Sequence, residues 1–171
     1  TGEPIELESY PYELVSNTYE DGQGKYKFNE DVVDIGDYFF NPVENMNGLF
    51  TSITLPSGIN HIDSYLALGN LHNASSLILP ENLESIGLDF IGGFGKNLNE
   101  KHLYFLSAKC PTYVGTSIWG AFWNQSSTLY VHYPKGSDYS IVESELEKWK
   151  NEYSNFIYRL VETEYKIIQH N

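Results

Sequence analysis

Histidine and cysteine are the residue types of this sequence best suited to metal binding or nucleophilic catalysis. The five histidines are His61, His72, His102, His132 and His170. No His-x-x-x-His pair places two of them on one helical turn. In the repeat register derived below, His102 and His132 lie on neighbouring strands but four positions apart, or about 14 Å. Because two ligands of one zinc ion must lie much closer, we predict no metal site and no cofactor.

Nucleophile motifs are not recognisable in the sequence. Cys110 is the only cysteine, so it cannot form an intrachain disulfide, and no motif assigns it a base. We therefore expect a small buried thiol there. The stretch 115–117 lacks the second glycine of a Gly-x-Ser-x-Gly elbow. The glycine cluster at 92–95 lacks the dinucleotide-binding spacing, and we expect a loop between structural repeats.

Acidic side chains are plentiful, but their pattern selects no site. An acidic run contains Glu30, Asp31, Asp34 and Asp37. It lacks the alternating ligands and central glycine of a calcium loop, so a solvated edge is expected. Twenty-three acids always allow some carboxylate pair suited to glycoside hydrolysis, and a hydrolase with such a pair stays open as an alternative.

Charge and composition restrict the classes of partner. The 171 residues include 10 Lys and Arg against 23 Asp and Glu, a formal charge of -13. This charge disfavours nucleic acid and anionic membrane surfaces. No apolar run approaches the ~20 residues of a membrane-spanning helix, so no transmembrane segment is expected. A 41% hydrophobic and 15% aromatic composition predicts one folded domain.

Short apolar segments recur along the chain. Each has apolar residues at its first and third positions, and their starts are separated by 27, 24, 26 and 26 residues. The segments are Tyr26–Phe28, Ile53–Leu55, Leu77–Leu79, Leu103–Phe105 and Leu129–Val131. Period-two alternation places both apolar side chains on one side of a strand. Pro56 and Pro80 are expected to end two of these strands.

A second apolar column runs in step with the first. It contains Ile35, Ile62, Ile86 and Val114, followed four residues later by Phe39, Leu66, Phe90 and Ile118. Each unit is therefore a strand, a turn, a second short element and a return. A single unit cannot bury its apolar face, but stacked units form a continuous core, as in a solenoid. An ordinary sandwich with chance spacing is the alternative, which two columns in step disfavour.

The amino-acid sequence of the repeats resembles that of a known family. It reads LFTSITLPSGINHI at 49–62 and LILPENLESIG at 77–87, and the end of the chain adds 108–115, 128–136 and a helix with Trp149. These segments resemble the BspA-like leucine-rich repeats of bacterial surface proteins. The resemblance implies secretion, or a lipid anchor upstream of Thr1, and a function in adhesion or protein binding. It carries over no catalytic residue.

Caps are expected at both ends of the stack. We divide one domain into an N-terminal cap at 1–24, repeats at 25–133, and a C-terminal helix, strand and tail at 134–171. The helix follows Ser137-Asp138 as N-cap and has one apolar stripe: Tyr139, Val142, Leu146, Trp149 and Tyr153. We expect this stripe to cover the last repeat rather than bind a partner. Phe156–Val161 is expected as a final strand and 162–171 as a mobile end. Ile5–Leu7 and Glu13–Val15 are possible strands before a turn at 21–24.

The outward positions of the strands give the candidate binding site. The C-terminal half of this face is apolar and aromatic, and the candidate ligand-binding residues are Ile78, Tyr104, Leu106, Tyr130 and His132. A protein ligand is favoured because tyrosines are common interface anchors, whereas exposed aromatic planes would favour glycans. The alternative is that the C-terminal cap or the chain end covers these residues. Trp119 and Trp123 are expected either in the core or at the rim of this face. For Phe122, the family resemblance favours a place in the core.

We therefore expect an α+β repeat fold, namely a short right-handed leucine-rich-repeat solenoid with a parallel strand ladder and a C-terminal capping helix. The expected function is a non-catalytic binding or adhesion module, secreted or on the cell surface, that recognises a protein ligand. A carbohydrate-binding or accessory module of a glycan-handling system is the first alternative, and the hydrolase is the second.

Overall fold

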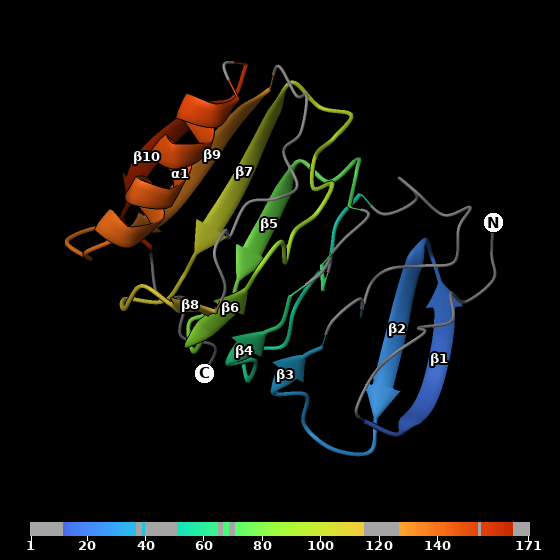
Figure 1. Ribbon diagram of the computed structural model, residues 1–171. Coiled ribbons are helices and arrows are strands. Elements are labelled where there is room, and N and C mark those ends of the chain that lie inside the picture. The colour runs from blue at the N-terminus through green and yellow to red at the C-terminus, as the bar shows by residue number, and fades with distance from the viewer. Residues whose placement is uncertain are drawn as a thin grey trace.

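A computed structural model describes residues 12–36, 39, 51–64, 67–68, 71–114, 127–153 and 155–165. It is a β-solenoid of about four turns with parallel strands and one short helix (Figure 1). The elements are β1 (Leu14–Glu20), β2 (Gln23–Phe28), β3 (Asp34–Ile35), β4 (His61–Ile62), β5 (Ser76–Leu79), β6 (Ser85–Gly87), β7 (Glu100–Phe105), β8 (Thr112–Val114), β9 (Thr128–Pro134), α1 (Ser140–Glu152) and β10 (Ile157–Thr163).

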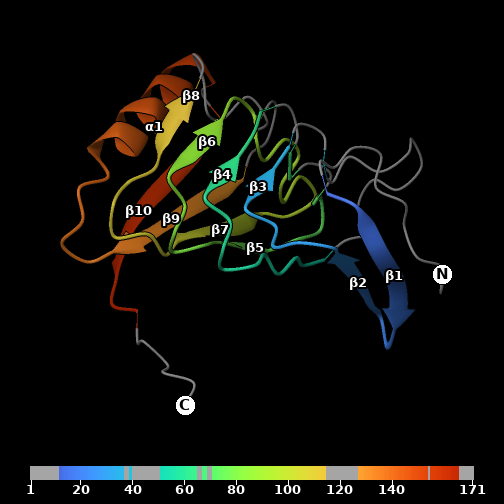
Figure 2. The same cartoon turned by 90° about the horizontal axis from the view of Figure 1, so that it is seen from below.

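Two parallel ladders face each other across the core (Figure 2). The long-strand sheet has the order β10-β9-β7-β5, and the short-strand sheet has the order β3-β4-β6-β8. Along the chain, β5 to β9 alternate between the two sheets, so that each coil contributes one strand to each ladder. This confirms the expected stacked repeats and the parallel strand ladder.

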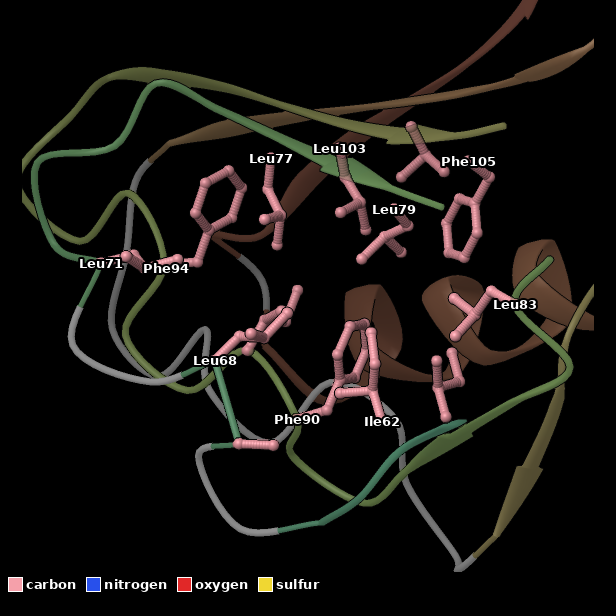
Figure 3. Close-up of a cluster of buried hydrophobic side chains, with 14 of the residues drawn as sticks. Ile62, Leu68, Leu71, Leu77, Leu79, Leu83, Phe90, Phe94, Leu103 and Phe105 are labelled. Atoms are coloured by element: carbon pink, nitrogen blue, oxygen red, sulfur yellow. The ribbon is translucent and has the colours of Figure 1, made fainter. Parts of the chain in front are cut away.

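The core lies between the two sheets. In β5 and β7 the apolar residues at alternate positions are buried, including Leu77, Leu79, Leu103 and Phe105. They point toward Ile62 and Phe90 on the opposite side of the core, and Leu83 from the connection between β5 and β6 packs beside them (Figure 3). Alternation along a strand is therefore what directs one set of side chains inward and leaves the other set on the outer surface.

The first two predicted strands do not belong to the long-strand sheet. Tyr26–Phe28 lies within β2, which pairs antiparallel with β1 in a separate hairpin. Asp21 and Gly22 form its turn with φ of 50° and 81°, the left-handed conformations that a two-residue hairpin turn requires. Ile53–Leu55 lies outside any strand, although Ile53 and Leu55 pack against the core as partly buried residues.

The register of the ladders corrects two further predictions. Leu77 lies opposite Leu103 as expected, but Leu103 lies opposite Val131 rather than Leu129. A shift of two residues preserves the inward set of a strand, so apolar alternation alone cannot detect it. In the short-strand sheet, Ile86 lies opposite Tyr113 instead of Val114. The ring of Tyr113 packs against the core and its hydroxyl reaches the C-terminal helix.

A β9–α1–β10 unit closes the C-terminal end. Helix α1 lies beside β8, at the end of the short-strand sheet (Figure 2), and Val142, Leu146 and Trp149 are buried as predicted. Its N-cap is Tyr139, while the preceding Asp138 accepts a hydrogen bond from the Ser140 amide at 3.0 Å. Strand β10 returns parallel to β9 and ends at Thr163, two residues beyond the predicted end.

The helix also buries one charged side chain, since Glu145 is only 3% exposed. Its carboxylate accepts a hydrogen bond from Tyr113 at 2.9 Å and pairs with Lys148. Several predictions lie outside the described residues, namely those for Ile5–Leu7, Asp37, Leu66, 115–117, Ile118, Trp119, Phe122, Trp123, 166–171 and His170. Within the described chain, no helix has both the length and the apolar character needed to cross a membrane.

Candidate binding face

The outer surface of the long-strand sheet carries the predicted site residues. Its outward positions form two rows across the four strands, which we call together the outer face. The first row contains Ser76, His102, Tyr130 and Arg159, and the second contains Ile78, Tyr104, His132 and Val161. The residues between them along β5, β7 and β9 are buried, so the fold of the core fixes the direction of every outward side chain.

Four rings occupy the centre of the outer face and form what we call the aromatic cluster: His102, Tyr104, Tyr130 and His132. The ring centroids of His102 and Tyr130 are 4.7 Å apart with an interplanar angle of 11°. Those of Tyr104 and His132 are 4.1 Å apart at 13°. Both stacks run along the ladder, because each joins side chains of one row on neighbouring strands. Each stack therefore covers one face of each of its rings.

The two histidines of the cluster are in contact. Nδ1 of His102 lies 3.0 Å from Nε2 of His132, so the predicted separation of about 14 Å is wrong. The two-residue register shift explains the error, because it places His132 opposite Tyr104, one row from His102. Burial, and then the neighbouring His102, lower the pKa of His132 below its ordinary value. Among the described residues, no group of three or more His, Cys, Asp or Glu side chains gathers in a metal-binding arrangement.

The structure places most of the predicted site residues together. Ile78, Tyr104, Tyr130 and His132 share the outer face, and Ile78 is 52% exposed. Leu106 lies just beyond the end of β7 and is partly buried, with its amide donating to the Leu79 carbonyl.

The predicted site lacks four residues of the outer face. His102 occupies its centre, Ser76 lies beside it on β5, and Arg159 and Val161 extend it onto β10. The sequence signal for β10 was the predicted strand after an amphipathic helix, since a β–α–β unit returns the chain parallel to its starting strand.

The chain end borders the outer face. Burial, together with the charge of nearby Tyr104, raises the pKa of Tyr165 to about 12, and its hydroxyl oxygen is buried without a hydrogen-bond partner among the described residues. Tyr165 follows β10 directly and is partly buried. The expected alternative, in which the chain end covers the aromatic residues, therefore has support at this border, whereas Ile78 on the opposite side of the cluster is exposed.

A second polar row lies on the short-strand sheet and has a superficial likeness to a catalytic triad. Asp34, His61 and Ser85 are aligned across β3, β4 and β6, and Nδ1 of His61 lies 2.5 Å from Oγ of Ser85. A triad also needs a carboxylate that orients the imidazole. Within the described part of the chain, His61 forms no ion pair, and one carboxylate oxygen of Asp34 is buried without a hydrogen-bond partner. The third interaction of a triad is therefore missing.

A groove of about 320 Å³ lies at the edge of β10, beside α1. Its lining residues are Glu143, Lys150, Phe156, Ile157, Tyr158, Arg159 and Leu160. Glycoside hydrolysis uses two carboxyl groups on either side of the scissile bond, and this groove contributes only that of Glu143. The groove therefore gives no support to the hydrolase alternative.

Cys110 has the properties of a structural residue. Its thiol is free and partly buried. Burial, followed by the charge of Asp138, raises the pKa of this thiol to about 11. A thiol with so high a pKa holds very little of the reactive thiolate near neutral pH. The expected small buried thiol is therefore only partly buried, and its raised pKa is typical of a structural residue.

Comparison with family models, curated proteins and solved structures finds no match to this chain. The structure itself shows a β-solenoid. The resemblance to BspA-like repeats therefore depends on the sequence segments at 49–62 and 77–87 and on the C-terminal segments quoted above.

Proposed function

We propose that the protein is a non-catalytic binding or adhesion module that recognises a protein ligand through the outer face of its long-strand sheet. The aromatic cluster is the observation that carries this proposal. Four rings and the exposed Ile78 lie side by side on the solvent side of a four-stranded parallel sheet. Aromatic groups gathered in this way are typical of the energetically dominant centres of protein interfaces.

The ring arrangement favours a protein over a sugar. Stacking on a sugar requires a free ring face, and one face of each ring in the two stacked pairs is already covered by its partner. The cluster also offers tyrosine hydroxyls and an imidazole nitrogen, which are hydrogen-bonding groups suited to a peptide surface. Mutual stacking also fixes the side chains before binding, so little rotamer entropy is lost when a ligand arrives.

The leucine-rich-repeat identity belongs to the same proposal. The stacked parallel coils and the aliphatic residues at matching positions support a BspA-like repeat protein, and a right-handed coil is the sense expected for parallel crossover connections. This identity carries with it the proposed location, which is the cell surface or the extracellular medium, with a lipid anchor upstream of Thr1 as one means of attachment.

An array of purified extracellular matrix proteins and soluble glycans tests the proposal. The wild-type chain is compared with the double variant Tyr104→Ser/Tyr130→Ser. The matched control, Tyr19→Ser/Ile141→Ser, changes two exposed positions outside the long-strand sheet. We expect the wild type and the control to bind the same array protein, and the cluster variant to bind it at least tenfold more weakly. Equal binding by all three chains, or binding to glycans alone, would contradict the proposal.

Circular dichroism and urea unfolding must accompany the array, because the comparison requires folded variants. Both tyrosines lie on the outer surface of a sheet whose core is formed by other residues. We therefore expect the cluster variant to keep its fold, whereas global unfolding would show that the cluster is part of the core.

A further inference from the structure

A directed chain of hydrogen bonds crosses the outer face from β7 to β10. Nδ1 of His132 lies 3.4 Å from Oγ1 of Thr163, and this hydroxyl donates to the Val161 carbonyl at 3.3 Å. The proton of the Thr163 hydroxyl is thereby committed, so its oxygen is the acceptor toward His132. Nδ1 of His132 must then carry a proton.

The same reasoning assigns the protons of His102. A neutral imidazole with a proton on Nδ1 has a bare Nε2. Nε2 of His132 is therefore the acceptor in its 3.0 Å contact, and Nδ1 of His102 is the donor. The remaining nitrogen, Nε2 of His102, is left without a proton. It has no hydrogen-bond partner among the described residues, and it is not among their buried unpartnered atoms, so it reaches solvent.

We propose that His102 presents a bare Nε2 at the centre of the outer face, where it accepts a hydrogen bond from an N–H or O–H group of the ligand. This inference rests on the proposed binding function. It adds the chemistry that the ligand must offer.

Nitrogen NMR of the full chain tests the proton assignment without any ligand. In ¹⁵N-labelled protein at pH 7.5, correlations between ring nitrogens and ring protons distinguish a protonated nitrogen from a bare one. We expect a bare Nε2 in His102 and a protonated Nδ1 in His132. A protonated Nε2 in neutral His102 would overturn the assignment.

Thr163 offers a sharp pair of variants. Thr163→Val removes the final acceptor, so the chain loses its direction and His132 becomes free to donate from Nε2 to His102. Thr163→Ser keeps the hydroxyl and serves as the matched control. Diethyl pyrocarbonate, which acylates unprotonated imidazole nitrogen with loss of ethanol and carbon dioxide, measures the bare Nε2. We expect acylation of His102 to slow at least threefold in Thr163→Val and to stay unchanged in Thr163→Ser. Equal rates in all three chains would overturn the directed chain.

Indole and 1-methylindole test the ligand chemistry, because they share a ring system and only indole carries an N–H donor. We expect millimolar indole to shift the Nε2 resonance of His102 at pH 7.5, while 1-methylindole shifts it at least threefold less. Equal shifts from both probes, or from neither, would overturn the donor requirement. These measurements are independent of the protein array. The array can therefore fail while the proton assignment holds, and the proton assignment can fail while the array succeeds.

Discussion

The side chain of Lys101 lies directly against the backbone of Gly95. A methyl group added at Gly95 would lie 2.7 Å from Cδ and 3.0 Å from Cβ of this lysine. Lys101 belongs to β7 and is fully buried, and Gly95 lies in the preceding turn with φ of +60°. The absence of a side chain at Gly95 therefore leaves the space that the aliphatic part of Lys101 occupies.

Gly95→Ala is expected to destabilise the protein through two separate effects. A left-handed backbone costs a non-glycine residue about 1–2 kcal/mol. The overlap with Lys101 adds about 1–3 kcal/mol of overpacking. Gly136→Ala is the matched control, since Gly136 has φ of +81° but nothing within 4 Å of an added methyl. Urea unfolding should show a larger loss of unfolding free energy at Gly95 than at Gly136. Equal losses would mean that the contact with Lys101 relaxes freely.

Lys101 also makes stability depend on pH. Burial lowers the pKa of its ammonium group to about 8 in the folded chain, from an ordinary 10.5. Between these values the unfolded chain holds more protons, so stability rises as the pH increases from 8 toward 10.5, by about 3 kcal/mol in total. Lys101→Met removes this group. The unfolding free energy of the wild type should therefore rise relative to that of the variant as the pH increases over this range. Parallel pH profiles of the two chains would contradict the low pKa.

The apolar columns of the sequence were sufficient to predict the stacked architecture. Aliphatic residues at alternate positions can be buried only when strands are extended and side by side, as Leu77 and Leu103 are. The same alternation placed Ile78, Tyr104 and Tyr130 on the outer surface, because a period of two leaves no other direction for the middle residue. The direction of these side chains was therefore predictable from the sequence.

Contacts across neighbouring strands were less predictable. The meeting of His102 and His132 depends on how β7 and β9 align, because this alignment places His132 opposite Tyr104. Two registers that differ by two residues bury the same apolar set, so the apolar pattern did not distinguish them. The assignment of Tyr26–Phe28 to the parallel ladder was wrong for a related reason, because an alternating segment fits an antiparallel hairpin as well as a parallel sheet. The Asp21-Gly22 turn signal favours the hairpin.

Tyr113→Phe is expected to loosen the C-terminal helix. The Tyr113 hydroxyl donates to Glu145, whose carboxylate is buried and receives its other hydrogen bond from Lys148. Removing one donor leaves a buried charged oxygen less well satisfied, which costs about 1–3 kcal/mol.

Tyr158→Phe is the matched control for this change. Its hydroxyl donates at 2.5 Å to Glu147, a side chain that is 45% exposed and that water can solvate in the variant. Loss of this hydrogen bond should lower the free energy of unfolding by no more than about 1 kcal/mol. Thermal unfolding of both variants measures the difference. A larger effect at Tyr158 would show that the surface contact, rather than the buried carboxylate, anchors the helix.

Leu79→Ala and Ile78→Ala test the separation of core and outer face within a single strand. Leu79 is 0% exposed and Ile78 is 52% exposed, although they are consecutive residues of β5. Truncation at Leu79 removes buried contacts and leaves a cavity, so we expect a loss of about 2–5 kcal/mol in urea unfolding. Truncation at Ile78 should change stability by no more than about 0.5 kcal/mol, because its side chain lies largely in water. A loss at Ile78 comparable to that at Leu79 would mean that the outer face is covered in solution. The aromatic cluster beside it would then be an internal contact, unable to receive a ligand.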